Sequence, residues 1–267
     1  MLDSNPVPLS EGESNIIRGS GRRIVTAAGA MLADEANAPE WAKAAADAIF
    51  DPQQWSRRAT AVPAARGRGA TWFVGDESRS WVLRHYRRGG LVARFLADRY
   101  LWTGEDRVRA FAEWRLLDHL WRHGVCVPRP IAARYRRVGP FYRCDLITVR
   151  IPDARPLSDR LSDAAVPSGL WSALGIAVAR LHHAGVDHAD LNAHNVLIDA
   201  GDRISFIDFD RGRVRRDGPW TARNLRRLRR SLRKIGADRV SRAFDAGWRA
   251  FLAAYAAERA AARPIGG

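Results

Sequence analysis

Short apolar runs separated by turn residues dominate the first half of the chain. Two of them, residues 70–74 and 81–86, lie on either side of a Gly-Asp turn signal, which predicts a β-hairpin. Residues 141–151 predict a further strand. Apolar positions recur at helical spacing over residues 105–123 and predict a helix that the following glycine ends. A shorter helix is predicted over residues 39–49, so this half combines strands with a few helices.

Helical patterns dominate the second half, which begins after the connector PDARP at residues 152–156. One helix is predicted over residues 168–184, and residues 220–262 are predicted to be helical, first Arg-rich and then Ala-rich. Between these helices, the apolar runs 196–199 and 204–208 predict a short hairpin. Strands followed mostly by helices predict an α+β fold of two lobes.

The composition along the chain sets the expected boundaries. Residues 1–22 are rich in Pro, Ser, Gly and Glu and are expected to form a flexible tail. The connector divides the remainder into an N-lobe at residues 23–151 and a C-lobe at residues 152–267. The N-terminus lacks the regions of a secretory signal, and no apolar run is long enough to span a membrane, so any membrane contact is expected from the surface.

The overall charge is strongly basic. The 267 residues carry 44 Lys and Arg against 29 Asp and Glu, a net charge of +15, and nearly all the cations are Arg. This charge predicts an anionic partner such as nucleic acid, nucleotide phosphates or a membrane surface, although a high-GC genome would also favour Arg. Cys126 and Cys144 lack the spacing of a metal site and are expected to be buried free thiols, which suits a reducing compartment.

One stretch carries a recognisable chemical pattern. The sequence HADLNAHN, beginning at His188, matches H-x-D-L-x-x-x-N, and Asp208 opens a D-F-D triplet thirteen residues after Asn195. Phosphoryl transfer needs a carboxylate that faces the acceptor hydroxyl and oxygen ligands that hold Mg²⁺ on ATP. We therefore predict Asp190 as the catalytic carboxylate and Asn195 and Asp208 as Mg²⁺ ligands. In this pattern the chain resembles protein-kinase-like phosphotransferases, in which the residue at the place of His188 packs beneath the D-F-G element.

The nucleotide-binding features of that superfamily are partly altered. Gly67 and Gly69 resemble the start of G-x-G-x-x-G, but Trp72 stands where the third glycine is expected. Arg84 stands in the place of the strand lysine that contacts ATP phosphates, and Glu113 on the next helix is its expected ion-pair partner. The alternative is that Arg84 and Glu113 are ordinary surface charges.

The segment after the D-F-D triplet indicates the kind of acceptor. It reaches a helical pattern within ten residues and contains no A-P-E motif, which leaves little room for a peptide platform and favours a small-molecule or glycolipid acceptor. Several segments together resemble the 3-deoxy-D-manno-octulosonic acid (Kdo) kinase family of Gram-negative bacteria. These segments are FDP at residues 50–52, RGRG at 66–69, LRHYRRGG at 83–90, HADLNAHN at 188–195 and IDFDRG at 207–212.

The resemblance implies a specific activity. Members of this family use ATP to phosphorylate the 4-hydroxyl of the Kdo sugar on a lipid A precursor, an anionic glycolipid. That reaction belongs to lipopolysaccharide core synthesis at the cytoplasmic face of the inner membrane. The chain is therefore expected to be a peripheral enzyme that meets an anionic membrane, with no nucleic acid as partner.

A basic amphipathic helix agrees with that expectation. Residues 221–235 place Leu225, Leu228, Leu232 and Ile235 on one face and Arg or Lys on the other. Such a helix can lie on an anionic membrane or hold lipid phosphates, with Arg226, Arg227, Arg229 and Arg230 as the expected contacts. The alternative is a core helix whose Arg face is merely solvated.

Three other functions are compatible with parts of the sequence. A heptose or aminoglycoside phosphotransferase would share the motifs and differ in acceptor. A nucleic-acid-binding protein would use the Arg-rich helix but leaves the spacing of the three motif residues unexplained. A pseudokinase scaffold is suggested by Arg84 and the missing third glycine, yet all three motif positions are retained.

Overall fold

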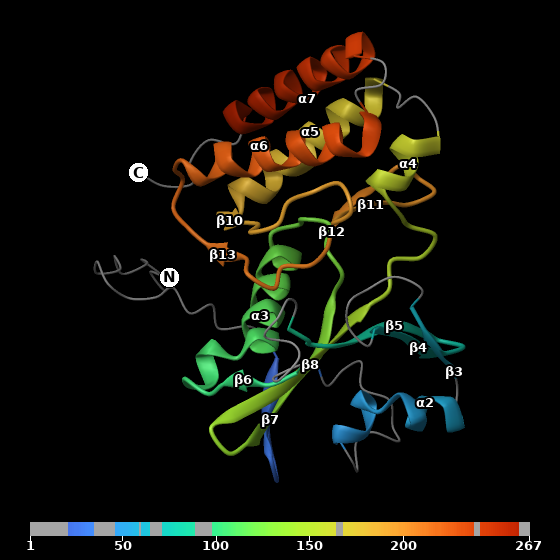
Figure 1. The fold of residues 1–267 in the computed structure, drawn as a ribbon, viewed down its shortest axis with the longest axis vertical. Helices are drawn as coiled ribbons and strands as arrows, with labels where there is room; N and C mark the ends of the chain where they lie inside the picture. The colour runs from blue at the N-terminus through green and yellow to red at the C-terminus, as the bar shows by residue number, and fades with distance from the viewer. Residues whose placement is uncertain are drawn as a thin grey trace, which may run out of the picture.

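The computed structural model describes residues 21–34, 46–58, 60–64, 71–88, 98–163, 168–237 and 241–261. Within these ranges, most strands gather at one end of the molecule and most helices at the other, with helix α3 (Arg109–Arg122) between them (Figure 1). The α+β arrangement predicted from the sequence is confirmed.

An antiparallel sheet forms the first end. Seven of its strands run in the order β1-β2-β7-β8-β5-β4-β3, and β6 pairs with β8. The strands are β1 (Arg22–Thr26), β2 (Gly29–Ala33), β3 (Thr60–Pro63), β4 (Thr71–Asp76), β5 (Arg79–His85), β6 (Tyr100–Leu101), β7 (Pro130–Val138) and β8 (Phe141–Val149).

The predicted hairpin is confirmed, but its turn lies further along the chain. Gly75 is part of β4 and pairs with Ser80 of β5, and the turn is made by the two residues after Asp76. Asp76 Oδ1 accepts hydrogen bonds from the backbone N–H of Ser78, at 3.0 Å, and from its hydroxyl, at 2.9 Å. A Cβ on Gly75 would lie 2.0 Å from the Arg79 carbonyl oxygen, so the glycine serves close strand pairing rather than the turn.

Short helices cover part of this sheet. A 3₁₀ turn at Ala46–Phe50 leads into α2 (Pro52–Arg58), and Trp55 is fully buried in a cluster with residues of β2, β4, β5 and β7. The helix predicted over residues 39–49 is described only for its last turn. The Asp51 carboxylate accepts the Gln53 N–H at 2.9 Å and caps α2, with Pro52 in the first helical position.

Helix α3 joins the sheet to the helical end. A 3₁₀ turn at Glu105–Arg107 precedes it, and Gly124, at φ 69°, follows its end as predicted. Phe111, Trp114 and Leu117 of α3 are buried in one apolar cluster that also contains residues of β7, β8 and the C-terminal helices. Since α3 is packed on both sides, its polar side chains have fixed positions between the two ends.

The second end consists mainly of helices. They are α4 (Leu157–Asp163), α5 (Ser168–His183), α6 (Trp220–Leu232), a π-helical turn (Arg233–Ala237) and α7 (Ser241–Ala261). Short strands accompany them: β9 (Arg155–Pro156), β10 (Val186–Asp187), β11 (Val196–Ile198), β12 (Ile204–Phe206) and β13 (Arg213–Val214). Strands β11 and β12 form the predicted hairpin, and the loop between β10 and β11 carries the HADLNAHN motif.

The two cysteines differ in their exposure. Cys144 is buried, but Cys126 is exposed, so the expectation of two buried thiols is wrong for Cys126; it lies between buried Val125 and Val127, where the chain leaves α3. Among the described residues, no helix is both long and apolar enough to cross a membrane.

Candidate active site

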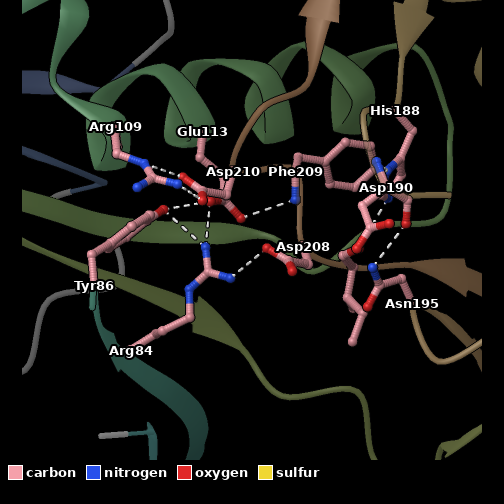
Figure 2. A network of polar contacts seen from close by, with 11 residues as sticks. Arg84, Tyr86, Arg109, Glu113, His188, Asp190, Asn195, Asp208, Phe209 and Asp210 are labelled. Atoms are coloured by element: carbon pink, nitrogen blue, oxygen red, sulfur yellow. Dashed lines mark hydrogen bonds and ion pairs between the residues drawn. The ribbon is translucent and has the colours of Figure 1, made fainter. Parts of the chain in front are cut away.

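The loop between β10 and β11 holds the predicted catalytic carboxylate. His188 is fully buried beneath it, and its ring lies 4.5 Å from that of Phe209, as the sequence resemblance implies. Its Nε2 lies 3.1 Å from the Ile207 carbonyl oxygen, and its Nδ1 accepts the Asp190 backbone N–H at 3.2 Å (Figure 2). Burial lowers the pKa of His188, which favours a neutral ring that donates through Nε2. His188 thus joins the catalytic loop to the D-F-D triplet.

Asn195 is oriented by the same loop. Its side-chain amide donates from Nδ2 to the Asp190 carbonyl oxygen at 2.9 Å, and its backbone carbonyl accepts the Ile207 N–H at 3.0 Å. Because the NH₂ group is engaged in this way, the Oδ1 atom is available as a metal ligand.

Asp208 follows β12 in an unusual backbone conformation. Its φ of 65° lies in the left-handed region, which a non-glycine residue adopts at an energetic cost that functional sites often carry. Its side chain and that of Asn195 both line a cavity of about 620 Å³. The two Mg²⁺ ligands predicted from the sequence therefore border one cavity.

The oxygen ligands fit the chemistry of Mg²⁺ bound with a nucleotide. Among the described residues, no group of three or more His, Cys, Asp or Glu side chains could hold a metal ion. Mg²⁺ in kinases needs no such group, because it is usually held by one or two protein oxygens together with substrate phosphates and water. One carboxylate and one amide oxygen beside a nucleotide-sized cavity match this requirement.

Arg84 of β5 forms the centre of a polar network (Figure 2). It pairs with Glu113 of α3, donates from Nη1 to Asp208 Oδ1 at 3.0 Å, and donates from Nη2 to the Tyr86 hydroxyl at 2.9 Å. Burial opposes the charge of Arg84, but Glu113, Tyr86 and Asp208 raise its pKa well above the ordinary value, so it stays charged. The interpretation of Arg84 and Glu113 as ordinary surface charges is wrong, since Glu113 is only 3% exposed.

Glu113 also controls the backbone of the D-F-D triplet. Its Oε1 accepts the Phe209 N–H at 3.2 Å, while its Oε2 accepts hydrogen bonds from Arg84 and Tyr86. Burial raises the pKa of Tyr86, so its hydroxyl remains a donor to Glu113. Sequence reasoning missed Tyr86; its position two residues after Arg84, on the same face of the extended chain, was the available signal.

A second ion pair fixes the other end of the triplet. Arg109, at the start of α3, forks onto Asp210, with Nε 2.7 Å from Oδ1 and Nη2 hydrogen-bonded to Oδ2. Sequence reasoning missed this pair because the two residues are 101 positions apart. The triplet is therefore bound to α3 at two points, by Glu113 and by Arg109.

The cavity lies where the two ends of the molecule meet. It is lined by residues of β4, β5 and β8, by the connector before β9, and by Asn195 and Asp208. Its volume is typical of a small-molecule site. Gly67 and Gly69 lie outside the described residues, although Ala64 and Thr71, at either end of that gap, both line the cavity.

The predicted catalytic carboxylate, Asp190, lies outside the cavity. Asp190 is not among the residues that line the cavity, and its side chain is 60% exposed. Its Oδ1 lies 3.2 Å from Nη1 of Arg227 on α6. The Asp190 carboxylate is therefore accessible from the surface next to α6, outside the cavity.

Helix α6 has the predicted amphipathic character with one addition. Leu228 and Leu232 are fully buried, while Leu225 and Ile235 pack against the core from partly buried positions. Asn224, which the sequence did not single out, is 1% exposed on the same face. Of the four predicted membrane contacts, Arg227 pairs with Asp190, and the Arg229 guanidinium carbon lies 5.8 Å from the centre of the Trp248 ring of α7.

The sequence is similar to proteins of known family. The model of the "Lipopolysaccharide kinase (Kdo/WaaP) family" matches residues 52–255. A 3-deoxy-D-manno-octulosonic acid kinase of Xanthomonas euvesicatoria is 45% identical over 232 residues, covering 82% of this chain and 91% of the relative. The kinase of the same name from Vibrio parahaemolyticus is 45% identical over 186 residues, covering 70% of this chain and 78% of the relative.

A solved structure named "WaaP in complex with acyl carrier protein" is 20% identical, with a TM-score of 0.47, and the match covers 81% of this chain and 92% of that one. The family match spans most of the chain, and the curated relatives cover more than two thirds of it. The chain is therefore a kinase and belongs to the lipopolysaccharide kinase (Kdo/WaaP) family.

Proposed function

We propose that this chain transfers the γ-phosphoryl group of ATP to the 4-hydroxyl of a 3-deoxy-D-manno-octulosonic acid residue on a lipid A precursor. The acceptor sugar is that of the curated relatives, and the reaction is a step of lipopolysaccharide core synthesis. The observation that carries the proposal is the placement of Asp208 and Asn195 at a nucleotide-sized cavity with Asp190 on its acceptor side.

The residues would divide the work as follows. ATP would bind in the cavity beside the charged Arg84. Gly67 and Gly69 are the residues that the sequence predicts to hold its phosphates. Asp208 and Asn195 would hold Mg²⁺, which supplies positive charge to the phosphates when bound. Glu113 keeps Arg84 and the backbone at Phe209 in place through its two carboxylate oxygens.

Asp190 would orient the acceptor hydroxyl and accept its proton. The hydroxyl oxygen forms a bond to the γ-phosphorus as the bond from that phosphorus to the bridging oxygen of ADP breaks, and ADP leaves with that oxygen. His188 accepts the Asp190 backbone N–H through its Nδ1 and so positions the part of the loop that carries the carboxylate. In this division, residues 23–151 form the nucleotide-binding lobe and residues 152–267 carry the catalytic loop.

We also propose that the enzyme works as a peripheral protein at the cytoplasmic face of the inner membrane. Arg226 and Arg230 are exposed on α6, and cationic side chains on an amphipathic helix attract anionic lipids. Replacing both by Ala is expected to weaken binding to vesicles that contain anionic lipid, measured by cosedimentation. Unchanged binding would leave α6 with a purely structural and catalytic role.

The main test is phosphate transfer from [γ-³²P]ATP to Kdo-lipid IV(A), with and without Mg²⁺. Removing a general base lowers turnover by about 10²- to 10⁴-fold, so Asp190→Ala should transfer almost no label while its circular dichroism is unchanged. Asp106→Asn, which alters an exposed carboxylate on the turn before α3, is the control and should keep full activity. Label in a heptose acceptor but not in Kdo would keep the kinase and overturn the sugar assignment.

A further inference from the structure

Helix α6 runs alongside the catalytic loop and contacts it at successive turns. Asn224 donates from Nδ2 to Asp187 Oδ1 at 2.8 Å and accepts the His188 N–H at 3.1 Å. One turn later Arg227 reaches Asp190, and Ser231 accepts the Ala193 N–H at 3.1 Å. Residues three and four apart lie on one helix face, so the position of α6 decides which side chains stand in front of Asp190.

Arg227 pairs directly with the predicted catalytic carboxylate, with its Nη1 atom 3.2 Å from Asp190 Oδ1. Its side chain is 43% exposed, so a bound substrate can reach it. The pair with Asp190 uses one guanidinium nitrogen and one carboxylate oxygen. Since a guanidinium has five N–H donors in a planar fork, Arg227 can hold a second anion while it remains bonded to Asp190.

The charges around Arg227 favour an anion. Arg223 and Arg230 lie four residues before and three residues after it, and like charges at these spacings destabilise a helix unless something neutralises them. Arg223 is paired with Asp187, which Arg215 also shares. Within the part of the chain that the structure describes, Arg230 forms no ion pair. The arginines at positions 223, 227 and 230 of α6 therefore carry excess positive charge beside the proposed acceptor site.

We propose that Arg227 binds the carboxylate of the acceptor sugar acid and thereby presents the sugar hydroxyl to Asp190. The inference rests on the proposed function, because a 3-deoxyoctulosonic acid carries its carboxylate and the hydroxyl to be phosphorylated on the same ring. A planar guanidinium matches a carboxylate in geometry and forms charge-assisted hydrogen bonds with it. Arg227 is thus a substrate-binding residue that selects an acidic sugar.

The test compares two acceptors in neutral detergent micelles, which contain no anionic lipid. One is Kdo-lipid IV(A), and the other is its Kdo methyl ester, in which the carboxylate charge is removed. Losing a charge-assisted hydrogen-bonded pair is expected to raise KM about 10- to 100-fold, so Arg227→Ala should raise KM for the acid by that factor and leave kcat within about threefold. For the ester, the wild type and Arg227→Ala should have similar KM values.

Matched variants separate this role from others. Arg249→Ala removes the same charge from an exposed position on α7 and should behave as wild type. Arg227→Lys keeps a charge without the fork, and its KM for the acid should lie between those of the wild type and Arg227→Ala. An equal effect of Arg227→Ala on both acceptors, or a fall in kcat with unchanged KM, would overturn the inference and leave Arg227 as a residue that positions Asp190. Failure of the wild type to phosphorylate the acid would instead overturn the proposed function.

Discussion

Replacing Glu113 by alanine removes one acceptor that is shared by three donor groups from two distant segments of the chain. Arg84 of β5, Tyr86 and the backbone N–H of Phe209 all donate to this buried carboxylate. The substitution leaves the guanidinium of Arg84 without its main counter-charge and the Phe209 N–H without an acceptor. Both losses occur where little water can replace the missing bonds, since Glu113 is 3% exposed.

The expected loss in the free energy of unfolding follows from these contacts. Removing one partner of a buried ion pair costs about 3–5 kcal/mol, and a buried N–H left unsatisfied costs about 1–3 kcal/mol. Arg84 keeps its bond to Asp208 at 3.0 Å, which places the expected loss for Glu113→Ala near the low end, at about 3–4 kcal/mol. Glu113→Gln keeps an oxygen acceptor for the Phe209 N–H and should lose about 2 kcal/mol.

The matched control is Glu105, which forms a two-bond fork with Arg23 near the surface and accepts a hydrogen bond from the Tyr135 hydroxyl at 2.8 Å. It accepts from Arg23 at 2.7 and 2.8 Å, but the side chain of Arg23 is 49% exposed. Exposed ion pairs contribute about 1 kcal/mol or less, so Glu105→Ala should be the milder change. Urea unfolding followed by the fluorescence of the ten tryptophans gives both free energies. Equal losses for the two alanine variants would refute the claim that the Glu113 network holds the site together.

Three further outcomes are expected. Arg84→Lys replaces a fork by a single ammonium and should raise KM for ATP about 10-fold in initial-rate assays; an unchanged KM would remove Arg84 from nucleotide binding. Gly175→Ala on α5 places a Cβ 2.3 Å from the Phe251 carbonyl oxygen of α7 and should lower the free energy of unfolding by about 1–3 kcal/mol. The control Gly169→Ala places a Cβ with nothing within 4 Å and should leave that free energy unchanged or raise it by up to about 1 kcal/mol. Similar melting temperatures for the two variants would contradict this expectation. His182 is buried, and burial lowers its pKa from 6.5 to about 4. The unfolded chain therefore binds a proton between pH 7.5 and 5 that the folded chain does not bind. The free energy of unfolding of the wild type should fall by about 2 kcal/mol over this range, and that of His182→Asn should not show this fall. Equal falls for the two proteins in urea titrations would show that another group is responsible.

The sequence alone determined those features that are encoded by neighbouring residues. Asp190 and Asn195 lie in one loop, and Asp208 follows the adjoining hairpin, so their spacing along the chain already brings them near one another. The amphipathic pattern of α6 likewise identified its buried leucines, because the helical repeat alone decides which residues share a face. The roles of Asp190, Asn195 and Asp208 in catalysis and in binding Mg²⁺ are proposals, for which the phosphate-transfer assay is the test.

Features that depend on how distant segments meet were not predictable in the same way. The position of Gly75 suggested a turn, but close pairing with β5 placed it inside a strand. The partners of Asp210 and Asp190 come from α3 and α6, which lie 101 and 37 residues away in the chain. No local pattern records such pairs, because the side chain that fills a given space depends on how whole elements pack.

The chain thus encodes its phosphotransfer motif and its two-part architecture in local spacing and periodicity. Only the tertiary structure decided that Tyr86 completes the Arg84–Glu113 pair and that Arg227, one of many similar arginines on a basic helix, contacts Asp190. The physical reason is that charge and periodicity are properties of a segment, whereas a contact requires that two segments be packed against the same third one, as α6 and the catalytic loop are packed against the core.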